Sequence, residues 1–423
     1  MKKSLVKFVA LTTTLLAISG CGKSKNTNEL VIWSYDVATT NAMVTEYQKV
    51  KPDTNIRVVP VDGNSYISIL QTALFVDEDI PDIIWGDYFS RGKLFSLNVC
   101  EDLSKEPYNL DTSLVSDWVI ELCKNEAGEL LGLESGPAPT GLLYKRDICR
   151  TYLGTDDEAA LSTMFSTWDS FVNACETIYE NSSHTVVPFA SIGDVYCILV
   201  GLANEPYMKN GKQNIDAVCD AVFEKLHYFV ENGLCGKMDQ WTAAYYTAYN
   251  NNKYCFNICP AWCMDYHIKH NAPDQDGNFG ICMSPGGKMY NFGGTSYSIY
   301  KKSKMKTEAW DFIKWTLLTE EGQKNVQSAI IGAGGSGGVG TLKTLYNDEM
   351  YQKEDSFFGG QKILKFFVDN MDNVNARPLS KYDTTFSDSL GLVLNSMKNG
   401  LSVAECKTQV MNELRLKLPE LFE

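Results

Sequence analysis

Residues 29–87 of the chain read ELVIWSYDVATTNAMVTEYQKVKPDTNIRVVPVDGNSYISILQTALFVDEDIPDIIWGD. Within them lie three short, mainly apolar runs, at residues 30–34, 56–61 and 81–85. Such runs are typical of parallel strands that are buried on both faces. The two stretches between them have the 3.6-residue periodicity of helices, which gives the order strand, helix, strand, helix, strand. This order predicts right-handed βαβ units, a parallel sheet and an α/β fold.

The remainder of the chain is long enough for a second domain, because the whole sequence has 423 residues, of which 44% are hydrophobic. Further amphipathic helices are predicted at residues 167–179, 215–229, 307–317 and 403–416. We find no internal repeat and no long low-complexity linker. The one break in composition is a glycine-rich run at residues 332–340.

The formal net charge of the chain is −14. The first twenty residues contain only basic charges, Lys2, Lys3 and Lys7, so the rest of the chain is more acidic still. An acidic protein without a basic run repels phosphate backbones. The charge therefore disfavours nucleic-acid binding.

The N-terminus has the form of a secretory signal peptide, predicted at residues 1–20. A basic start is followed by an apolar stretch that is too short to span a bilayer, and then by ISGC, residues 18–21. This ending resembles the bacterial lipobox, in which the cysteine is lipidated, so Cys21 is the predicted lipid-bearing residue and residues 21–28 a polar tether. The alternative is an ordinary signal that is cleaved near Gly20. Either way the protein is expected outside the cytoplasm, and the lipobox reading places it on the outer face of the membrane.

The sequence contains twelve cysteines besides Cys21. An even number in a secreted protein suggests disulfides, but that rule applies to small domains that cannot build a core. Cys175 and Cys219 occupy the apolar faces of predicted helices, where a small hydrophobic side chain belongs. We therefore expect mostly free, buried thiols, although the sequence does not fix their redox state.

Two motif matches are rejected as accidental. The glycine run fits both a dinucleotide-binding pattern and a nucleophile elbow around Ser336, but helical sequence precedes it where both motifs need a strand. Cys255, Cys259 and Cys263, followed by His267 and His270, have a metal-like spacing that Pro260 interrupts. We accordingly expect neither a metal nor a cofactor.

Several weak motifs follow one another in a fixed order after Cys21. They are ELVIWS (29–34), IPDIIWGD (80–87), GLLYKRD (141–147), STWDSF (166–171), CPAW (259–262), GGTSYSI (293–299) and AWDFI (309–313). This series resembles extracellular solute-binding protein family 1, the maltose-binding-protein-like lipoproteins that deliver sugars to ABC importers. The chain departs from the family pattern at residues 252–256 and in the glycine run, where contacts with a ligand are in doubt.

The resemblance implies a class II periplasmic-binding-protein-like fold with parallel or mixed sheets flanked by helices. Domain one would comprise residues 29–136 and 290–340, and domain two residues 137–289 and 341–423, joined by two or three hinge crossings. Such proteins close on their ligand and act as monomers that present it to ABC permease subunits. The implied ligand is a carbohydrate, in particular an oligosaccharide, and no catalysis is implied.

Ligands of open α/β sheets lie beyond the carboxyl ends of the strands. That rule selects Tyr35 and Asp36 after the first strand, and Asp87 and Tyr88 after the third. Trp262 is the leading candidate for a surface on which a sugar ring stacks, followed by Trp241. Further candidates are Tyr144, Thr295, Tyr297, Arg377 and Tyr382, of which Arg377 either binds ligand or pairs with a neighbouring acid.

Two other functions remain open at this point. A lipid-anchored glycoside hydrolase would use two of the carboxylates Asp87, Glu134 and Asp265, whose separation the sequence does not give. A sensor protein would present a ligand, including a non-sugar solute, to a membrane receptor. An enzyme would release products, whereas a binding protein returns its ligand unchanged.

Overall fold

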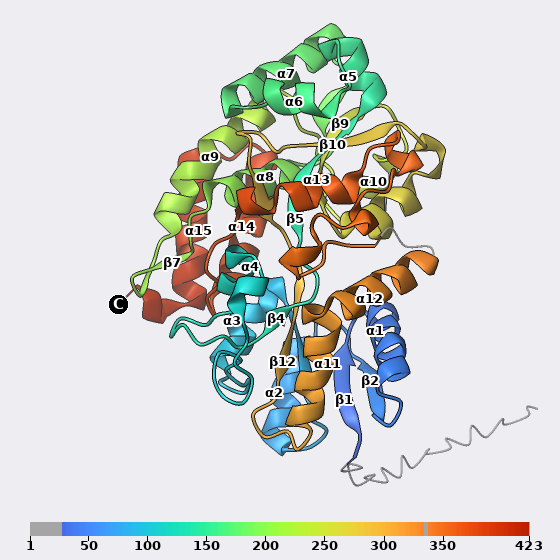
Figure 1. Ribbon diagram of the computed structural model, residues 1–423. Coiled ribbons are helices and arrows are strands. Elements are labelled where there is room, and N and C mark those ends of the chain that lie inside the picture. The colour runs from blue at the N-terminus through green and yellow to red at the C-terminus, as the bar shows by residue number, and fades with distance from the viewer. Residues whose placement is uncertain (1–27, 334–336, 423) are drawn as a thin grey trace, which may run out of the picture.

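The computed structural model describes residues 28–333 and 337–422. Residues 1–27, which include the predicted signal peptide and Cys21, lie outside this part of the chain, as does Ser336. The described residues form two lobes, each built on its own sheet (Figure 1). We call them lobe one and lobe two.

Lobe one has a five-stranded mixed sheet in the order β2-β1-β3-β12-β4. Its strands are β1 (Leu30–Ser34), β2 (Ile56–Pro60), β3 (Ile83–Asp87), β4 (Leu133–Glu134) and β12 (Thr295–Ile299). β1 pairs in parallel with β2 and β3, whereas β12 is antiparallel to β3 and β4. β12 thus arrives from far along the chain and lies beside strands of the N-terminal part (Figure 1).

Helices cover the sheet of lobe one. They are α1 (Val37–Val50), α2 (Tyr66–Val76), α3 (Tyr88–Ser96), η1 (Thr112–Leu114), α4 (Asp117–Glu121), α11 (Lys306–Leu318) and α12 (Glu320–Gly332). The βαβαβ order predicted for residues 29–87 is therefore present, and the α/β class is confirmed. α12 ends at Gly332, so a helix and not a strand precedes the glycine run.

Lobe two has a second sheet in the order β13-β11-β5-β9-β6, with β10 also paired to β5. Its strands are β5 (Pro139–Lys145), β6 (Val187–Phe189), β9 (Tyr254–Pro260), β10 (Phe279–Cys282), β11 (Met289–Asn291) and β13 (Val374–Asn375), and a separate hairpin joins β7 (Met208–Lys209) to β8 (Lys212–Gln213). Tyr290 and Asn291 pair with β5, so the chain returns to lobe one only after Asn291.

The longer helices of lobe two pack around this sheet. They are α5 (Arg146–Leu153), α6 (Glu158–Met164), α7 (Trp168–Asn181), α8 (Ile192–Ala203), α9 (Ile215–Glu231), α10 (Ala243–Thr247), α13 (Ile363–Asp369), α14 (Asp383–Lys398) and α15 (Val403–Lys417). Short turns are η3 (Pro273–Gln275), η6 (Ser356–Phe358), η7 (Met371–Asn373) and η8 (Pro419–Leu421), and η2 (Met264–Lys269) is a π-helix. η4 (Lys343–Leu345) and η5 (Glu349–Tyr351) also lie against lobe one, through contacts such as Thr344–Glu320 and Lys324–Asp348. Thr167 caps α7 as predicted, since its hydroxyl accepts a hydrogen bond from the backbone N–H of Ser170.

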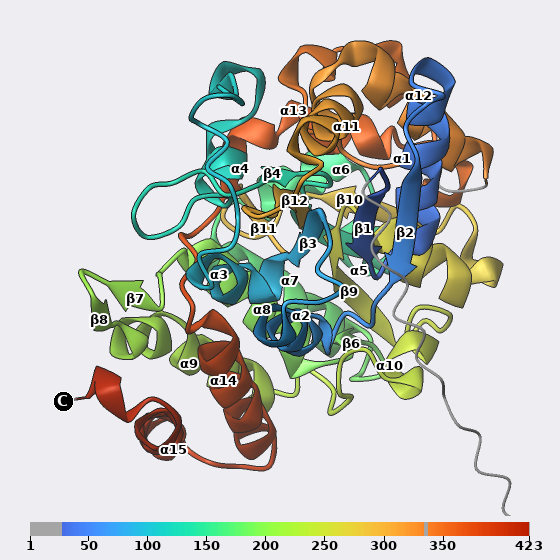
Figure 2. The same ribbon diagram turned by 90° about the horizontal axis from the view of Figure 1, so that it is seen from below.

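The lobes are connected at three places. The chain crosses at residues 135–138 and 292–294, and it leaves lobe one again near Thr341, whose hydroxyl donates to the Glu134 carbonyl. α14 adds a fourth link, because it packs on α3 of lobe one as well as on α8, α9 and α15 (Figure 2). α14 and α1 lie at opposite edges of the molecule in Figures 1 and 2.

All twelve cysteines of the described residues are free thiols, and eleven of them are buried. Cys149 and Cys255 are in contact, with their sulfur atoms 3.7 Å apart. Within residues 28–333 and 337–422, no helix is long and apolar enough to cross a membrane, and no group of three or more His, Cys, Asp or Glu is arranged to hold a metal ion.

Candidate ligand-binding site

One wall of the candidate site stands at the carboxyl ends of β1 and β3. The Tyr35 hydroxyl donates to Oδ2 of Asp87 at 3.0 Å, and the Tyr35 ring stacks on Trp85 with centroids 4.4 Å apart and planes 9° apart. Burial raises the pKa of Tyr35, and the neighbouring Asp87 charge raises it further. The hydroxyl thus stays a hydrogen-bond donor, and Tyr35, still 38% exposed, offers a fixed aromatic face.

Asp87 is held from two sides. Its Oδ1 accepts the backbone N–H of Phe89 at 2.9 Å and so caps α3. Burial raises the pKa of Asp87, and this effect exceeds the lowering by the Phe89 and Tyr35 hydrogen bonds and by the Arg91 charge. Each carboxylate oxygen has a second lone pair, so both can still accept a hydrogen bond from a ligand hydroxyl.

A second wall is aromatic, belongs to lobe two and lies beside the crossing at residues 292–294. Trp241, Trp262 and His267 form a cluster in which the ring centroids of each pair lie 5.1–6.1 Å apart. Nε1 of Trp262 donates to the Phe292 carbonyl at 2.9 Å, which fixes the indole. Burial lowers the pKa of His267, so this ring favours the neutral form. We call Trp241 and Trp262 the tryptophan platform.

Two backbone features place the tryptophan platform. Gly293 has φ +104°, and a Cβ there would lie 2.6 Å from Nε1 of Trp262, so only glycine lets the indole lie against this crossing. Trp241 has φ 63°, in the left-handed region. A bulky residue there is strained by about 1–3 kcal/mol, and such strain is common at binding sites.

The two walls are joined by contacts between the lobes. The Tyr266 hydroxyl, from η2, donates to Oδ2 of Asp36 at 2.7 Å, while Oδ1 of Asp36 caps α1. Phe89 of α3 packs edge-on against Phe292, with centroids 5.2 Å apart. In this structure the predicted residue Asp36 therefore takes part in a lobe–lobe contact.

A buried ion pair lies behind the lobe-one wall. Nη1 of Arg91 is 2.6 Å from Oε2 of Glu134, and both side chains are at most 1% exposed. Burial raises the pKa of Glu134 to about 7 against the opposing effect of Arg91. A Cβ on Gly294 would lie 2.7 Å from Oε1 of Glu134, so the ion pair sits directly against a lobe crossing. Its burial removes Glu134 as a hydrolytic acid that could reach a bound glycoside.

Two predicted contacts are wrong in this structure. Tyr144 is fully buried in the core of lobe two, where its hydroxyl donates to the Asp156 carbonyl at 2.8 Å. Tyr297 is 1% exposed in the core of lobe one and donates to the sulfur of Met43. Successive side chains of a strand point to opposite faces, and both tyrosines occupy the face that is turned into the core.

The other predicted residues lie near the lobe junction. The Thr295 hydroxyl is 2.9 Å from Oγ of Ser135 at the first crossing. Tyr382 precedes α14 and is partly buried against the core of lobe two. Tyr88, only 8% exposed, and Arg377 both line a pocket beside α14.

This pocket, which we call the α14 pocket, has a volume of about 260 Å³. Tyr88 and Phe89 of α3 form one side, and residues of α8, β11 and α14 form the other. It therefore lies between the lobes. Arg377 has an acid partner in the structure, because Nη1 is 2.6 Å from Oδ2 of Asp383, and its contact with a ligand stays a prediction.

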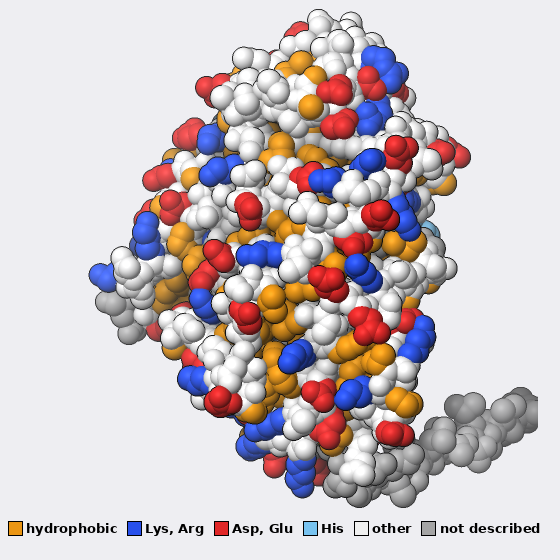
Figure 3. All heavy atoms as spheres, in the orientation of Figure 1, with side chains coloured by type: hydrophobic (Ala, Val, Ile, Leu, Met, Phe, Trp, Pro, Cys, Tyr) orange, Lys and Arg blue, Asp and Glu red, His pale blue; other side chains and the backbone are white. Residues whose placement is uncertain are grey.

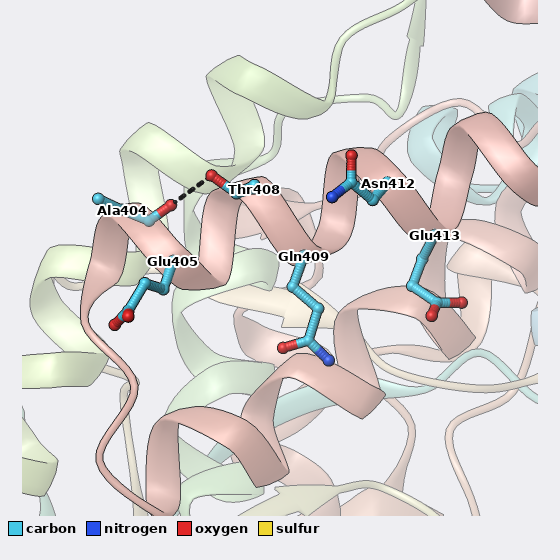
Figure 4. Close-up of a pocket in the computed structure, with 6 residues that line it drawn as sticks. All are labelled: Ala404, Glu405, Thr408, Gln409, Asn412 and Glu413. Carbon is cyan, nitrogen blue, oxygen red and sulfur yellow. Dashed lines mark hydrogen bonds between the residues drawn. The ribbon is translucent and has the colours of Figure 1, made fainter.

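A second hollow lies elsewhere and has a different character. It measures about 430 Å³, and its lining residues are Ala404, Glu405, Thr408, Gln409, Asn412 and Glu413 (Figure 4). All six belong to α15, so this hollow is an open strip along one helix and brings no second element to a ligand. We assign it no part in the site.

Sequence reasoning missed several residues of the junction, among them Phe89, Tyr266, His267 and Phe292. Phe89 directly follows the predicted pair Asp87 and Tyr88, so its place after the third strand was the available signal. Tyr266 and His267 lie in a π-helix, which has no sequence pattern comparable to that of an α-helix.

No family model matches the chain. A lactose-binding protein of Rhizobium radiobacter is 25% identical over 377 residues, which cover 85% of each chain. An arabinooligosaccharide-binding protein of Bacillus subtilis (strain 168) is 24% identical over 411 residues, covering 89% of this chain and 90% of that protein.

Among solved structures, an extracellular solute-binding protein of family 1 superposes with a TM-score of 0.82 at 19% identity, covering 91% of this chain and 98% of the other. This chain has the fold of solute-binding protein family 1. The galacto-N-biose/lacto-N-biose I-binding protein of the ABC transporter from Bifidobacterium longum shares that fold with a TM-score of 0.70 at 16% identity, covering 93% of this chain and 97% of that one. The predicted resemblance to family 1 is thereby confirmed.

Proposed function

We propose that this protein captures an oligosaccharide outside the cytoplasmic membrane and delivers it to an ABC import permease. The observation that carries the proposal is the pair of walls at the lobe junction. One wall presents Tyr35 and Asp87, and the other presents the tryptophan platform.

The two walls suit the two kinds of surface on a sugar. The C–H face of a sugar ring is apolar and stacks on an indole, which excludes water from one side. The hydroxyls around the ring edge donate to a carboxylate, and hydrogen bonds to a charged acceptor are the stronger kind. Trp241, which is 37% exposed, and Asp87 supply these two groups.

The sequence relatives support the same ligand class. Their names specify lactose and arabino-oligosaccharides, which are sugars of two or more units. The Bifidobacterium longum protein, which shares the fold, belongs to an ABC transporter. The face in Figure 3 carries interspersed acidic and basic side chains, with hydrophobic side chains between them across the middle.

Capture would proceed by closure of the lobes around the hinge crossings, a standard motion of two-lobed binding proteins. The Tyr266–Asp36 hydrogen bond is a contact that forms only when the lobes meet. The permease can then distinguish loaded from empty protein by the shape of the closed form. Lipidation of Cys21 would hold the protein at the outer face of the membrane.

Calorimetric titration of the purified protein with lactose, arabinobiose, galactose and arabinose tests the proposal. We expect at least one disaccharide to bind, to stabilise the fold by about 2.7 kcal/mol at a hundred times its Kd, and to be recovered intact. Binding of phosphodiesters or peptides but of no sugar would contradict the ligand class. Recovery of cleaved sugar would instead indicate a hydrolase.

A further inference from the structure

The α14 pocket is next to the tryptophan platform. Gln240 lines the pocket and directly precedes Trp241. Phe292 also lines it, and the Phe292 carbonyl is the acceptor of the Trp262 indole N–H at 2.9 Å. A ligand on the tryptophan platform thus has the pocket as its immediate neighbour.

The pocket is rich in hydroxyl groups. The hydroxyls of Tyr196 and Tyr207 are 3.5 Å apart, and that of Tyr207 is 3.4 Å from Oγ of Ser387. Hydroxyls both donate and accept, so this lining matches a ligand whose own polar groups are hydroxyls.

The pocket carries no unbalanced charge. Among its described lining residues only Arg377 is charged, and Asp383 neutralises it at 2.6 Å. The Arg377 guanidinium also lies 3.9 Å above the Tyr207 ring, which holds it flat against the wall. Asp383 already balances the charge of Arg377, so an anionic group would bring an uncompensated charge into the pocket, and the pocket favours a neutral ligand.

We propose that the α14 pocket holds the terminal unit of a neutral oligosaccharide while the tryptophan platform holds the next unit. This inference rests on the proposed function and adds the charge, minimum length and bound end of the ligand. The volume of about 260 Å³ equals about nine water molecules at roughly 30 Å³ each, which is room for one sugar ring.

Gly391 provides a direct test, because it lines the pocket from α14 and a Cβ placed on it meets no atom within 4 Å. Gly391→Phe therefore adds bulk at the pocket wall, and its Cβ meets no neighbour. Leu392→Phe is the matched control, since Leu392 is the next residue of the same helix and is 48% exposed. Thermal melting establishes whether each variant is folded. If Gly391→Phe is not folded, Ser387→Leu takes its place, because Ser387 lines the pocket one helical turn away.

The measurement is the Kd of lactose and arabinobiose and of the monosaccharides galactose and arabinose for each protein. Wild type and Leu392→Phe should bind the better disaccharide at least tenfold more tightly than its monosaccharide. In the pocket-filling variant, the affinity for the disaccharide should fall at least tenfold, whereas the affinity for the monosaccharide should change little. The tryptophan fluorescence of this variant should still respond to added sugar. A disaccharide Kd that is unchanged in the pocket-filling variant would overturn the inference while leaving sugar binding intact.

A disaccharide that ends in a uronic acid, tested beside its neutral counterpart, probes the charge. We expect it to bind at least tenfold more weakly, and equal or tighter binding would overturn the neutral assignment. If wild type binds none of the sugars, the proposed function fails, and the ligand assigned to the pocket fails with it.

Discussion

The buried Glu134 carboxyl should make the stability of the protein depend on pH in a specific way. Burial raises its pKa from 4.5 to about 7 in the folded state. Unfolding exposes the group to water, where it returns to its ordinary value. The folded state therefore binds the proton more tightly, so the stabilisation is complete below pH 4.5 and is lost as the pH rises through 7.

The size of the effect follows from the two pKa values. At 1.36 kcal/mol per pKa unit, the whole loss is about 3.4 kcal/mol, and about 2.5 kcal/mol of it falls between pH 5 and pH 8. The substitution Glu134→Gln removes the titrating group and therefore isolates its contribution to the pH dependence of the unfolding free energy.

The assay is urea unfolding of wild type and Glu134→Gln at pH 5 and pH 8, followed by tryptophan fluorescence. We expect the gap in unfolding free energy between the two proteins to be smaller at pH 8 than at pH 5 by about 2.5 kcal/mol. Asp194→Asn can be compared with Glu134→Gln in the same assay, because burial also raises the pKa of the Asp194 carboxyl to about 7. A gap for Glu134→Gln that is equal at the two pH values would refute the reasoning.

Three further outcomes are expected. Trp262→Ala should weaken sugar binding at least tenfold through loss of the stacking surface, and calorimetry showing parental affinity would remove Trp262 from the site. Tyr266→Phe deletes the hydrogen bond to Asp36, so small-angle scattering should report a more open protein and the sugar Kd should rise several-fold; unchanged values for both would contradict the closing role of this contact. Cys149 and Cys255, whose sulfurs are 3.7 Å apart, should become linked when the protein is refolded with oxidised glutathione, which mass spectrometry of unreduced peptides detects; alkylation of both thiols would exclude the link.

The part of the fold that the sequence predicted is the part with strong local periodicity. The order of strands and helices over residues 29–87 appears in lobe one, because buried parallel strands and amphipathic helices each have a characteristic pattern. β4 has only two residues and was not predicted, since its pairing with β12 depends on residues 162–164 positions away in the chain. Short strands of this kind are determined by tertiary pairing.

The candidate site was predictable to a similar degree. The rule that ligands lie beyond strand ends selected Tyr35 and Asp87, which the structure places next to each other, and their contact with a ligand stays a prediction. It does not tell which face of a strand is turned inward, and for that reason Tyr144 and Tyr297 were assigned to a ligand although both are buried. The α14 pocket combines α3, α8, β11 and α14, and no local pattern reports such an assembly.

The packing of α14 against both lobes sets the direction in which a ligand can arrive. α14 contacts α3 and α8 on one side of the molecule, whereas Tyr266 and Asp36 form a lobe–lobe hydrogen bond near α1. Opening would then part the two lobes near α1, while α14 keeps its contacts with both lobes. Under the proposed assignment of the α14 pocket, a sugar chain that enters near α1 would reach this pocket with one end leading.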